Sequence, residues 1–352
     1  MKTDYLIVGQ GIAGSVMALT LHKRGKTVAV MGDETKSSSS RIAAGVYNPF
    51  NFRRVTPTWK ALETTGTARN FYTGAEQLTG RSFHRSLDIL RVFASAEEFV
   101  TWSLPVQGEA DFVTRISDEP QSGKAGTPFG YSVVTGGGIV NTQKFVEQTK
   151  LFFLGRNEFN NELFDAAKLE VTSEGVIYDR RITAAKIIFC QGHLGSENSF
   201  FDPQMWAPTK GELIHVSIPG LGIQEVINGP VYLAPLGDDL YVCGATFRPG
   251  KSDEEITEEG KTELLTKLRT MISLPLEVTG QFAGVRPAGR DRKPLVGLHT
   301  EHKQIAIFNG AGSKGVLLYP FLAKMLADHM ESGVPLLTEV DIARFSKRKP
   351  RQ

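Results

Sequence analysis

Three glycines directly after the first apolar run constrain the fold of this chain more than any other feature. Residues 5–8 have the pattern of a short buried strand, and residues 9–14 follow as GQGIAG, a G-x-G-x-x-G pattern. Residues 13–24 have helical spacing, and residues 27–31 form a second apolar run. Parallel strands that are covered on both faces have continuous apolar sequences of this kind. The opening segment therefore predicts a βαβ unit.

Each glycine has its own role in a turn that binds a dinucleotide. Gly9 permits the tight turn, Gly11 lets the backbone approach a pyrophosphate, and Gly14 allows close packing of helix on strand. Ile12 and Ala13 lie between the glycines at the turn into the helix, whose N-terminal N–H groups and dipole favour phosphate. The pattern is weak by itself, and a βαβ context makes it strong. A glycine turn that binds no nucleotide is the less favoured interpretation.

The acidic residue that usually binds the ribose departs from the common spacing. It is expected about 20 residues after the glycines, at the end of the second strand. That position holds Gly32, and Asp33 follows one residue later. We expect Asp33 to replace the missing acid.

Composition excludes several classes of protein. The chain has 352 residues with 40 Lys and Arg against 38 Asp and Glu, so no global field favours nucleic acid. The basic segment 344–351 is expected to be a solvated end. Neither cysteine, Cys190 or Cys243, belongs to a C-x-x-C pair, and we expect no metal site.

Cysteine content and the lengths of apolar runs also give expectations about the cellular location of the protein. Low cysteine use fits a reducing cytosol. The N-terminus lacks the pattern of a signal peptide, and no apolar run approaches the roughly 18 residues of a membrane span. We therefore expect a cytoplasmic protein with no membrane partner.

The later sequence alternates between two kinds of pattern. Helical spacing occurs at 58–78, 97–102, 141–153, 258–272 and 314–330, and loop composition at 33–40 and 119–128. Strand patterns occur within 81–94 and at 168–172, 175–178, 185–190, 212–216, 231–234, 240–243, 277–286 and 304–309. Nucleotide-domain patterns at both ends, with strand-rich sequence between them, predict two interleaved domains.

Further motifs resemble the D-amino-acid oxidase and glycine oxidase family of flavoproteins. They are SSSRIAAGVYNP at 38–49, GGIVN at 137–141, IIFCQG at 187–192, KGEL at 210–213, GVRP at 284–287 with Asp291, Pro294 and Gly297, and GAGSKG at 310–315. Each block alone is not specific to this family, but the occurrence of the blocks together in this order is specific. The resemblance implies an α/β fold in which a GR2-type Rossmann-like FAD domain is interleaved with an antiparallel-sheet substrate domain.

The resemblance also implies domain boundaries and cofactor contacts. The FAD domain would comprise 1–80, 137–210 and 280–352, and the substrate domain 81–136 and 211–279. Beside the fingerprint and Asp33, the expected FAD-binding residues are Arg41, Ala44, Gly45, Gly192, Gly312, Ser313, Lys314 and Gly315. Lys314 would stabilise negative charge on the reduced ring, with a solvated lysine as the alternative. No cysteine follows Cys243, so we expect non-covalent FAD.

The activity implied is oxidation of a small amine or amino acid. A hydride would pass from the α-carbon to the flavin, and the imine would be hydrolysed, with oxygen or an unknown molecule as electron acceptor. Arg286 lies in the G-x-R-P block and is the candidate for binding a substrate carboxylate, since its planar fork suits carboxylates. Its alternative is an ion pair with Asp291. Tyr232 and Tyr241 are candidates to cover the carboxylate.

Three other functions remain open. The C-terminal blocks look as much like the FAD domain of an enzyme that oxidises a secondary amine on a tRNA wobble uridine. That function needs a basic surface, for which Arg53, Arg54 and the C-terminal tail provide little, so a nucleic-acid partner is not expected. An NAD-dependent dehydrogenase and a flavin-binding protein without catalysis are the remaining alternatives.

Overall fold

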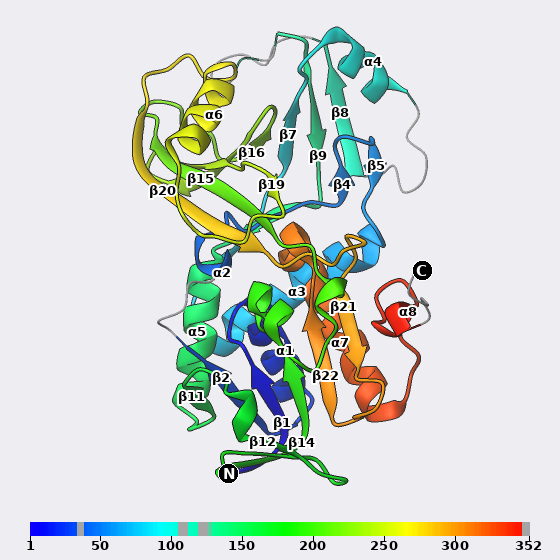
Figure 1. Ribbon diagram of the computed structural model, residues 1–352. Helices are drawn as coiled ribbons and strands as arrows, with labels where there is room; N and C mark the ends of the chain where they lie inside the picture. Colours follow the sequence, from blue (N-terminus) through cyan, green and yellow to red (C-terminus); the bar gives the residue numbers. More distant parts are fainter. Residues whose placement is uncertain (34–38, 105–111, 119–125, 127, 347–352) are drawn as a thin grey trace.

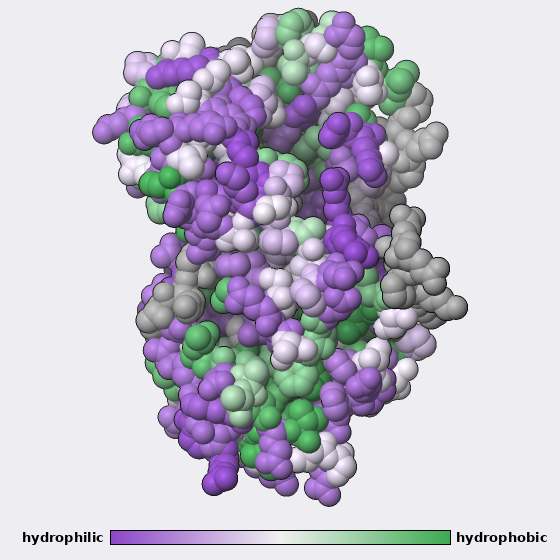
Figure 2. All heavy atoms as spheres, viewed as in Figure 1, coloured by the Kyte–Doolittle hydropathy of each residue, from purple (hydrophilic) through white to green (hydrophobic). Residues whose placement is uncertain are grey.

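The computed structural model describes residues 1–33, 39–104, 112–118, 126 and 128–346. Figure 1 shows two lobes, a lower one that contains both ends of the described chain and an upper one dominated by strands. Figure 2 shows hydrophilic side chains over most of the upper lobe, while hydrophobic side chains gather on the lower part of this face.

The lower lobe is built on an eight-stranded sheet. Its strands are β1 (Lys2–Val8), β2 (Val28–Gly32), β11 (Phe159–Asn161), β12 (Leu169–Val171), β13 (Val176–Tyr178), β14 (Ile182–Phe189), β21 (Leu295–Leu298) and β22 (Ile305–Asn309). The strands β11, β2, β1, β14 and β22 are parallel neighbours in that order. The β12–β13 hairpin and β21 add antiparallel pairs at its margins.

Helices cover one face of this sheet. They are α1 (Ile12–Lys23), α3 (Ala61–Thr79), α5 (Thr142–Leu154) and α7 (Gly315–Ser332). Their apolar faces form one buried cluster with β1 and β22, including Val16, Tyr72, Phe145 and Leu322. In the described part of the chain, none of the helices is both long and apolar enough to cross a bilayer.

The upper lobe contains a nine-stranded sheet. Its strands are β7 (Ile89–Val92), β8 (Val113–Ser117), β9 (Tyr131–Val134), β15 (Thr209–Ser217), β16 (Val226–Asn228), β17 (Tyr232–Gly237), β18 (Leu240–Gly244), β19 (Arg248–Pro249) and β20 (Glu277–Arg286). All its pairs are antiparallel except β7 with β16. Helices α6 (Glu258–Arg269) and α4 (Ala96–Ser103) pack in this lobe.

Smaller elements connect the lobes. They are α2 (Ser39–Ile42), the hairpin of β4 (Phe50–Asn51) with β5 (Thr56–Pro57), and the small sheet of β3 (Val46–Tyr47), β10 (Gly138–Val140) and β6 (His84–Ser86). The short 3-10 helices are η2 (Ala166–Lys168), η3 (Gly192–Glu197), η4 (Pro203–Met205) and η5 (Gly312–Lys314), and α8 (Ala343–Ser346) ends the described chain.

The predicted fold class is confirmed, with local differences. The helix expected at 58–78 begins at Ala61, because Lys60 has a left-handed backbone with φ 49°. The loop expected at 33–40 ends in α2, and most of the loop at 119–128 lies outside the described residues. The domain boundaries stay a prediction, and two of them fall inside β15 and β20.

Arg344 corrects the expectation of a solvated basic end. Its guanidinium makes an ion pair with Asp291, with Nε to Oδ2 at 2.8 Å, and lies over the ring of Phe345. It also donates to the carbonyls of Val340 and Pro294 at 2.8 and 3.0 Å. Arg344 therefore fastens the C-terminal segment to the loop between β20 and β21, while residues 347–351 lie outside the described chain.

Replacing Arg344 with alanine is expected to lower the free energy of unfolding by about 1–3 kcal/mol, since hydrogen bonds to charged groups are lost. Chemical denaturation monitored by circular dichroism measures the change. Lys324→Ala, on the exposed face of α7, is the control and should leave the midpoint unchanged. Equal midpoints for Arg344→Ala and the control would contradict the role of this contact.

Candidate active site

Three parallel strands end in glycine-containing turns at the same edge of the lower sheet. β1 leads into Gly9, β14 leads through Cys190 to Gly192, and β22 leads into Gly310 and Gly312. Ligands of open α/β sheets bind outside the carboxyl ends of the strands. The chain order of these turns spans some 300 residues, so the pairing of the strands is what brings them together.

A cavity opens over these turns. Its lining includes the fingerprint and residues from every neighbouring turn: Val8, Gly9, Gln10, Gly11, Ile12, Ala13, Met31, Gly32, Asp33, Ser39, Ser40, Arg41, Phe159, Glu162, Leu163, Phe164, Cys190, Gln191, Gly192, His193, Leu194, Pro287, Asn309, Gly312, Gly315 and Tyr319. We call it the nucleotide cavity.

The backbone around the fingerprint fits a dinucleotide. A Cβ atom on Gly9, whose φ is +100°, would lie 2.5 Å from the carbonyl oxygen of Cys190. A Cβ on Gly14 would lie 1.8 Å from the carbonyl oxygen of Gly9. Helix α1 has a glycine N-cap without a side-chain cap and has no acidic residue in its first turn. Its N-terminus is therefore suited to an anion, as a pyrophosphate-binding turn requires.

Gln10 explains why the ribose acid is displaced. Its side chain donates to Val146 O at 2.7 Å and lies against Gly32, where an added Cβ would approach Gln10 Cβ to 2.7 Å. An acidic side chain at position 32 would collide with it. Asp33 and Glu162 both line the cavity beyond this point. Glu162 already accepts two hydrogen bonds from Arg181, at 2.9 and 2.8 Å.

A second cavity adjoins the first one. Its lining is Ile12, Ser39, Ser40, Ile42, Ala43, Ala44, Gly45, Val46, Asn48, Phe52, Ile89, Thr142, Gly211, Leu213, Val226, Asn228, Tyr232, Ala245, Thr246, Phe247, Gly284, Arg286, Gly312, Ser313, Gly315 and Val316. Ile12, Ser39, Ser40, Gly312 and Gly315 line both cavities. One elongated site therefore runs from the fingerprint to the underside of the upper sheet, and we call this part the substrate-side cavity.

Arg286 stands at the end of β20 without a carboxylate partner among the residues described. Its Nη1 donates to Lys210 O and its Nη2 to Thr246 O, both at 3.2 Å. The guanidinium lies against Gly211, where an added Cβ would lie 2.3 Å from Nη2. Burial lowers the pKa of Arg286 below its usual value, and the neighbouring Tyr232 acts in the opposite direction. The alternative of an ion pair with Asp291 is wrong, because Asp291 binds Arg344.

Tyr232 approaches Arg286 from β17. Its hydroxyl lies 2.7 Å from the position that a Cβ on Gly244 would occupy. Gly244 pairs with Leu213 of β15 and with Tyr232 itself. Burial raises the pKa of Tyr232 well above the usual range, so the hydroxyl stays protonated. Glycines on adjacent strands thus leave room in the sheet face for a cation and a phenol.

Tyr241 is not brought to this site. Its hydroxyl donates to Asp239 Oδ1 at 3.2 Å and accepts from Ile223 N at 3.2 Å. Its ring belongs to the buried cluster between the sheet and α6. Successive residues of a strand point to opposite faces, and Gly244, which contacts Tyr232, is three positions away. The expectation for Tyr241 is therefore corrected.

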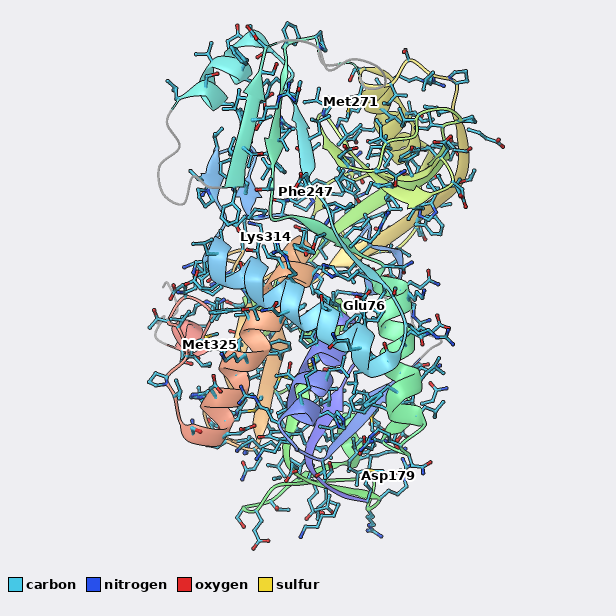
Figure 3. The ribbon with its side chains drawn as sticks, turned by 180° about the vertical axis from the view of Figure 1, so that it is seen from behind. Glu76, Asp179, Phe247, Met271, Lys314 and Met325 are labelled. Atoms are coloured by element: carbon cyan, nitrogen blue, oxygen red, sulfur yellow. The ribbon has the colours of Figure 1, made fainter. Side chains whose placement is uncertain are left out.

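Most residues expected to bind FAD line one of the two cavities: Gly9, Gly11, Ile12, Ala13, Asp33, Arg41, Ala44, Gly45, Gly192, Gly312, Ser313 and Gly315. Gly14 lies behind the turn, where helix and strand pack. Lys314 lines neither cavity, and its side chain belongs to a neighbouring recess at the junction of the lobes, below Phe247 in Figure 3. Its expected role at the flavin stays a prediction.

Sequence patterns missed several residues of the site. The hydroxyl of Ser40 accepts from Ile12 N at 3.0 Å and so joins α2 to the start of α1. Phe52, Asn228, Thr246 and Phe247 line the substrate-side cavity. Ser40 sits in the Ser-rich block, which gave a signal. The other four residues belong to segments without a recognisable motif, and only the folded structure shows that they line the cavity.

The comparisons with known proteins agree with this geometry. The model of the family described as FAD dependent oxidoreductase matches residues 4–329. The chain belongs to this family. It is therefore an FAD-dependent oxidoreductase. We expect the two cavities to hold the FAD, and together they are the expected FAD-binding region.

Individual relatives are similar over almost the whole chain. A glycine oxidase from Bacillus licheniformis is 24% identical over 99% of this chain and 98% of its own length. A bifunctional protein of tRNA 5-methylaminomethyl-2-thiouridine biosynthesis from Idiomarina loihiensis is 25% identical over 98% of this chain and 58% of its own length. Glycine oxidase from Geobacillus kaustophilus has the same fold, with a TM-score of 0.77, 20% identity and complete coverage of both chains.

Asp33→Asn is expected to raise the dissociation constant for FAD by about 10- to 100-fold, since a hydrogen bond to a charged group is lost. Fluorescence quenching during reconstitution of the apoprotein measures it. Glu162→Gln is the matched control at the same cavity edge and should have a smaller effect. A larger effect of Glu162→Gln would show that Glu162, and not Asp33, binds the ribose.

Proposed function

We propose that this enzyme oxidises a small amine or amino acid whose carboxylate is bound by Arg286. The observation that carries the proposal is a half-buried guanidinium in the substrate-side cavity that contacts only carbonyl oxygens in the described structure. A buried charge without a counter-charge is costly. An incoming carboxylate would supply that charge and accept the remaining N–H donors in a bidentate contact.

The residues of the cavity have distinct roles in this proposal. FAD, when bound, accepts the hydride equivalent from the α-carbon of the substrate. Arg286 fixes the carboxylate, and the Tyr232 hydroxyl covers it as a neutral donor. The apolar side chains of Leu213 and Val226 exclude water around the reacting carbon.

The same cavity lacks a general base among its described lining residues. Its only titratable side chains are Tyr232 and Arg286, and neither accepts a proton near neutral pH. The substrate must therefore reach the site as the neutral amine. Positioning, charge compensation and exclusion of water are then the whole contribution of these side chains to the chemistry.

Anaerobic titration of the purified protein with a panel of amines and amino acids tests the proposal directly. Bleaching of the visible flavin band by one of them is the expected result, and readmission of air then distinguishes an oxidase from a dehydrogenase. A yellow protein that none of them bleaches would contradict the proposal.

Arg286→Ala is expected to lower kcat/KM for amino-acid substrates by about 100- to 1,000-fold, because the bidentate charge contact is lost. Arg286→Lys should have a kcat/KM between those of the unchanged enzyme and Arg286→Ala, since a point charge replaces the planar fork. The measurement compares N-ethylglycine with N-ethylmethylamine, which lacks the carboxylate. Arg290→Ala, at an exposed position after β20, is the control. An equal loss for both amines would contradict carboxylate binding.

The pH dependence of kcat/KM should be set by the pKa of the substrate amine and not by a group of the enzyme. kcat/KM is expected to rise about tenfold per pH unit until the substrate ammonium is deprotonated. The raised pKa of Tyr232 keeps its hydroxyl protonated throughout this range. Amines of different pKa provide the measurement, because the inflection should move with each of them. One fixed inflection for all amines would reveal an enzyme base.

Oxidation of a secondary amine on a tRNA wobble uridine is the second candidate. The similarity to the tRNA-biosynthesis relative over 98% of this chain favours it. Bleaching of the flavin by undermodified tRNA, but by no small amine, would select this candidate over the first one.

A further inference from the structure

A solvent-open recess adjoins the substrate-side cavity. It has a volume of about 650 Å³ and lies between the β4–β5 hairpin, α4 and the start of α7. Phe52 and Asn228 line both the recess and the substrate-side cavity. A substituent that passed these two residues from a carboxylate on Arg286 would enter the recess.

Cations without carboxylate partners stand in this recess. Arg53 and Lys314 line it, and neither forms an ion pair within the described chain. Desolvation lowers the pKa of Lys314, and the charge of the nearby Arg54 lowers it further. Lys314 therefore lies in a repulsive positive field, which an anion would relieve.

The acidic residues of the recess do not neutralise these cations. Glu98 is engaged by Arg91, with 2.5 Å between Oε1 and Nη2, and Arg91 also donates to Asn228 Oδ1 at 2.7 Å. Glu97 is the remaining acid in the lining, and a hydrogen bond from Ser95 lowers its pKa. Arg53, Arg54 and Lys314 thus leave an excess of positive charge.

The wall of the recess offers another donor. Trp102 is fully buried in the lining, and its indole N–H has no hydrogen-bond partner among the residues described. Its ring stacks on Phe52, with 6.0 Å between the ring centroids. A buried polar group without a partner is costly.

Resting on the proposed function, we infer that the recess binds a second anionic group of the substrate. The substrate class is an amino acid whose amine or side chain carries an extended arm that ends in a carboxylate or a phosphate. Arg286 binds the first carboxylate, and Lys314 with Arg53 binds the terminal anion. Recognition of both ends would fix the α-carbon between them.

A single anionic arm fits the recess better than a nucleic acid does. RNA binding requires basic residues spread along a surface that follows several phosphates. Here Arg53 and Lys314 share one recess that also contains Glu97 and Glu98. The overall excess of 40 basic over 38 acidic residues provides no wider basic field.

Flavin absorbance tests binding without turnover. The holoenzyme is titrated with glutarate and with valerate, which differ in the second carboxylate. Glutarate is expected to bind at least tenfold more tightly, and Lys314→Met should remove most of that difference. Arg53→Gln serves as a second variant should Lys314→Met fail to fold. Lys324→Met, on the exposed face of α7, should keep the difference. Equal affinities for the two acids would overturn the inference.

Steady-state rates test the substrate class. N-propylglycine, N-(2-carboxyethyl)glycine and N-(2-phosphonoethyl)glycine share the reacting part and differ in the arm. The two substrates with an anionic arm are expected to have a higher kcat/KM, mainly through a lower KM. Whichever of these two has the higher kcat/KM shows whether the site prefers a carboxylate or a phosphate. Equal rates for all three would overturn the second anion site alone.

The two proposals fail in different ways. If no small amine is oxidised although glutarate binds tightly and depends on Lys314, the proposed function fails and the anion site stands. If RNA, but neither dicarboxylates nor anionic amines, perturbs the flavin in a Lys314-dependent manner, the small-molecule inference is overturned in favour of a nucleic-acid substrate.

Discussion

The parallel pairing of β1, β14 and β22 is the constraint on which the site depends. Their carboxyl ends meet at one edge, and each continues into a glycine-containing turn. The fit is close, since a Cβ on Gly9 would lie 2.5 Å from the Cys190 carbonyl of the neighbouring turn. A shift of one strand against another would therefore close the space that the pyrophosphate needs. The hydrophobic clusters on the two faces of the sheet hold that register.

The upper lobe uses glycine differently. Gly211 and Gly244 lie on adjacent antiparallel strands, and the space above them holds the guanidinium of Arg286 and the phenol of Tyr232. Backbone carbonyls orient the guanidinium without neutralising it. The described lining of this cavity contains no acid to compete with a substrate. The sheet thus presents a fixed positive charge to this cavity, and in the proposed function that charge favours anionic substrates.

Local sequence patterns predicted what depends on local geometry. The G-x-G-x-x-G turn, the first helix and the strand at 277–286 were identified because spacing and glycine placement report backbone conformation directly. The lack of room for an acidic side chain at position 32 could not be read from sequence, because it results from the packing of Gln10 against Gly32, 22 positions away. Arg344 with Asp291 is likewise a contact across the fold. The error for Tyr241 was avoidable in part, since strand alternation places it with Cys243 and not with Gly244.

The loop at the start of α7 shows that a sequence motif does not determine where each of its side chains lies. Gly312, Ser313 and Gly315 line the FAD-binding region, whereas the side chain of Lys314 lies in the adjoining recess. A motif defines where the backbone passes, and the direction of a side chain depends on turn geometry that the pattern does not specify. In residues 312–315 the backbone lines the substrate-side cavity, while the only charged side chain, that of Lys314, lines the adjoining recess. A ligand that binds Lys314 would therefore contact the same short segment whose glycines line the two cavities.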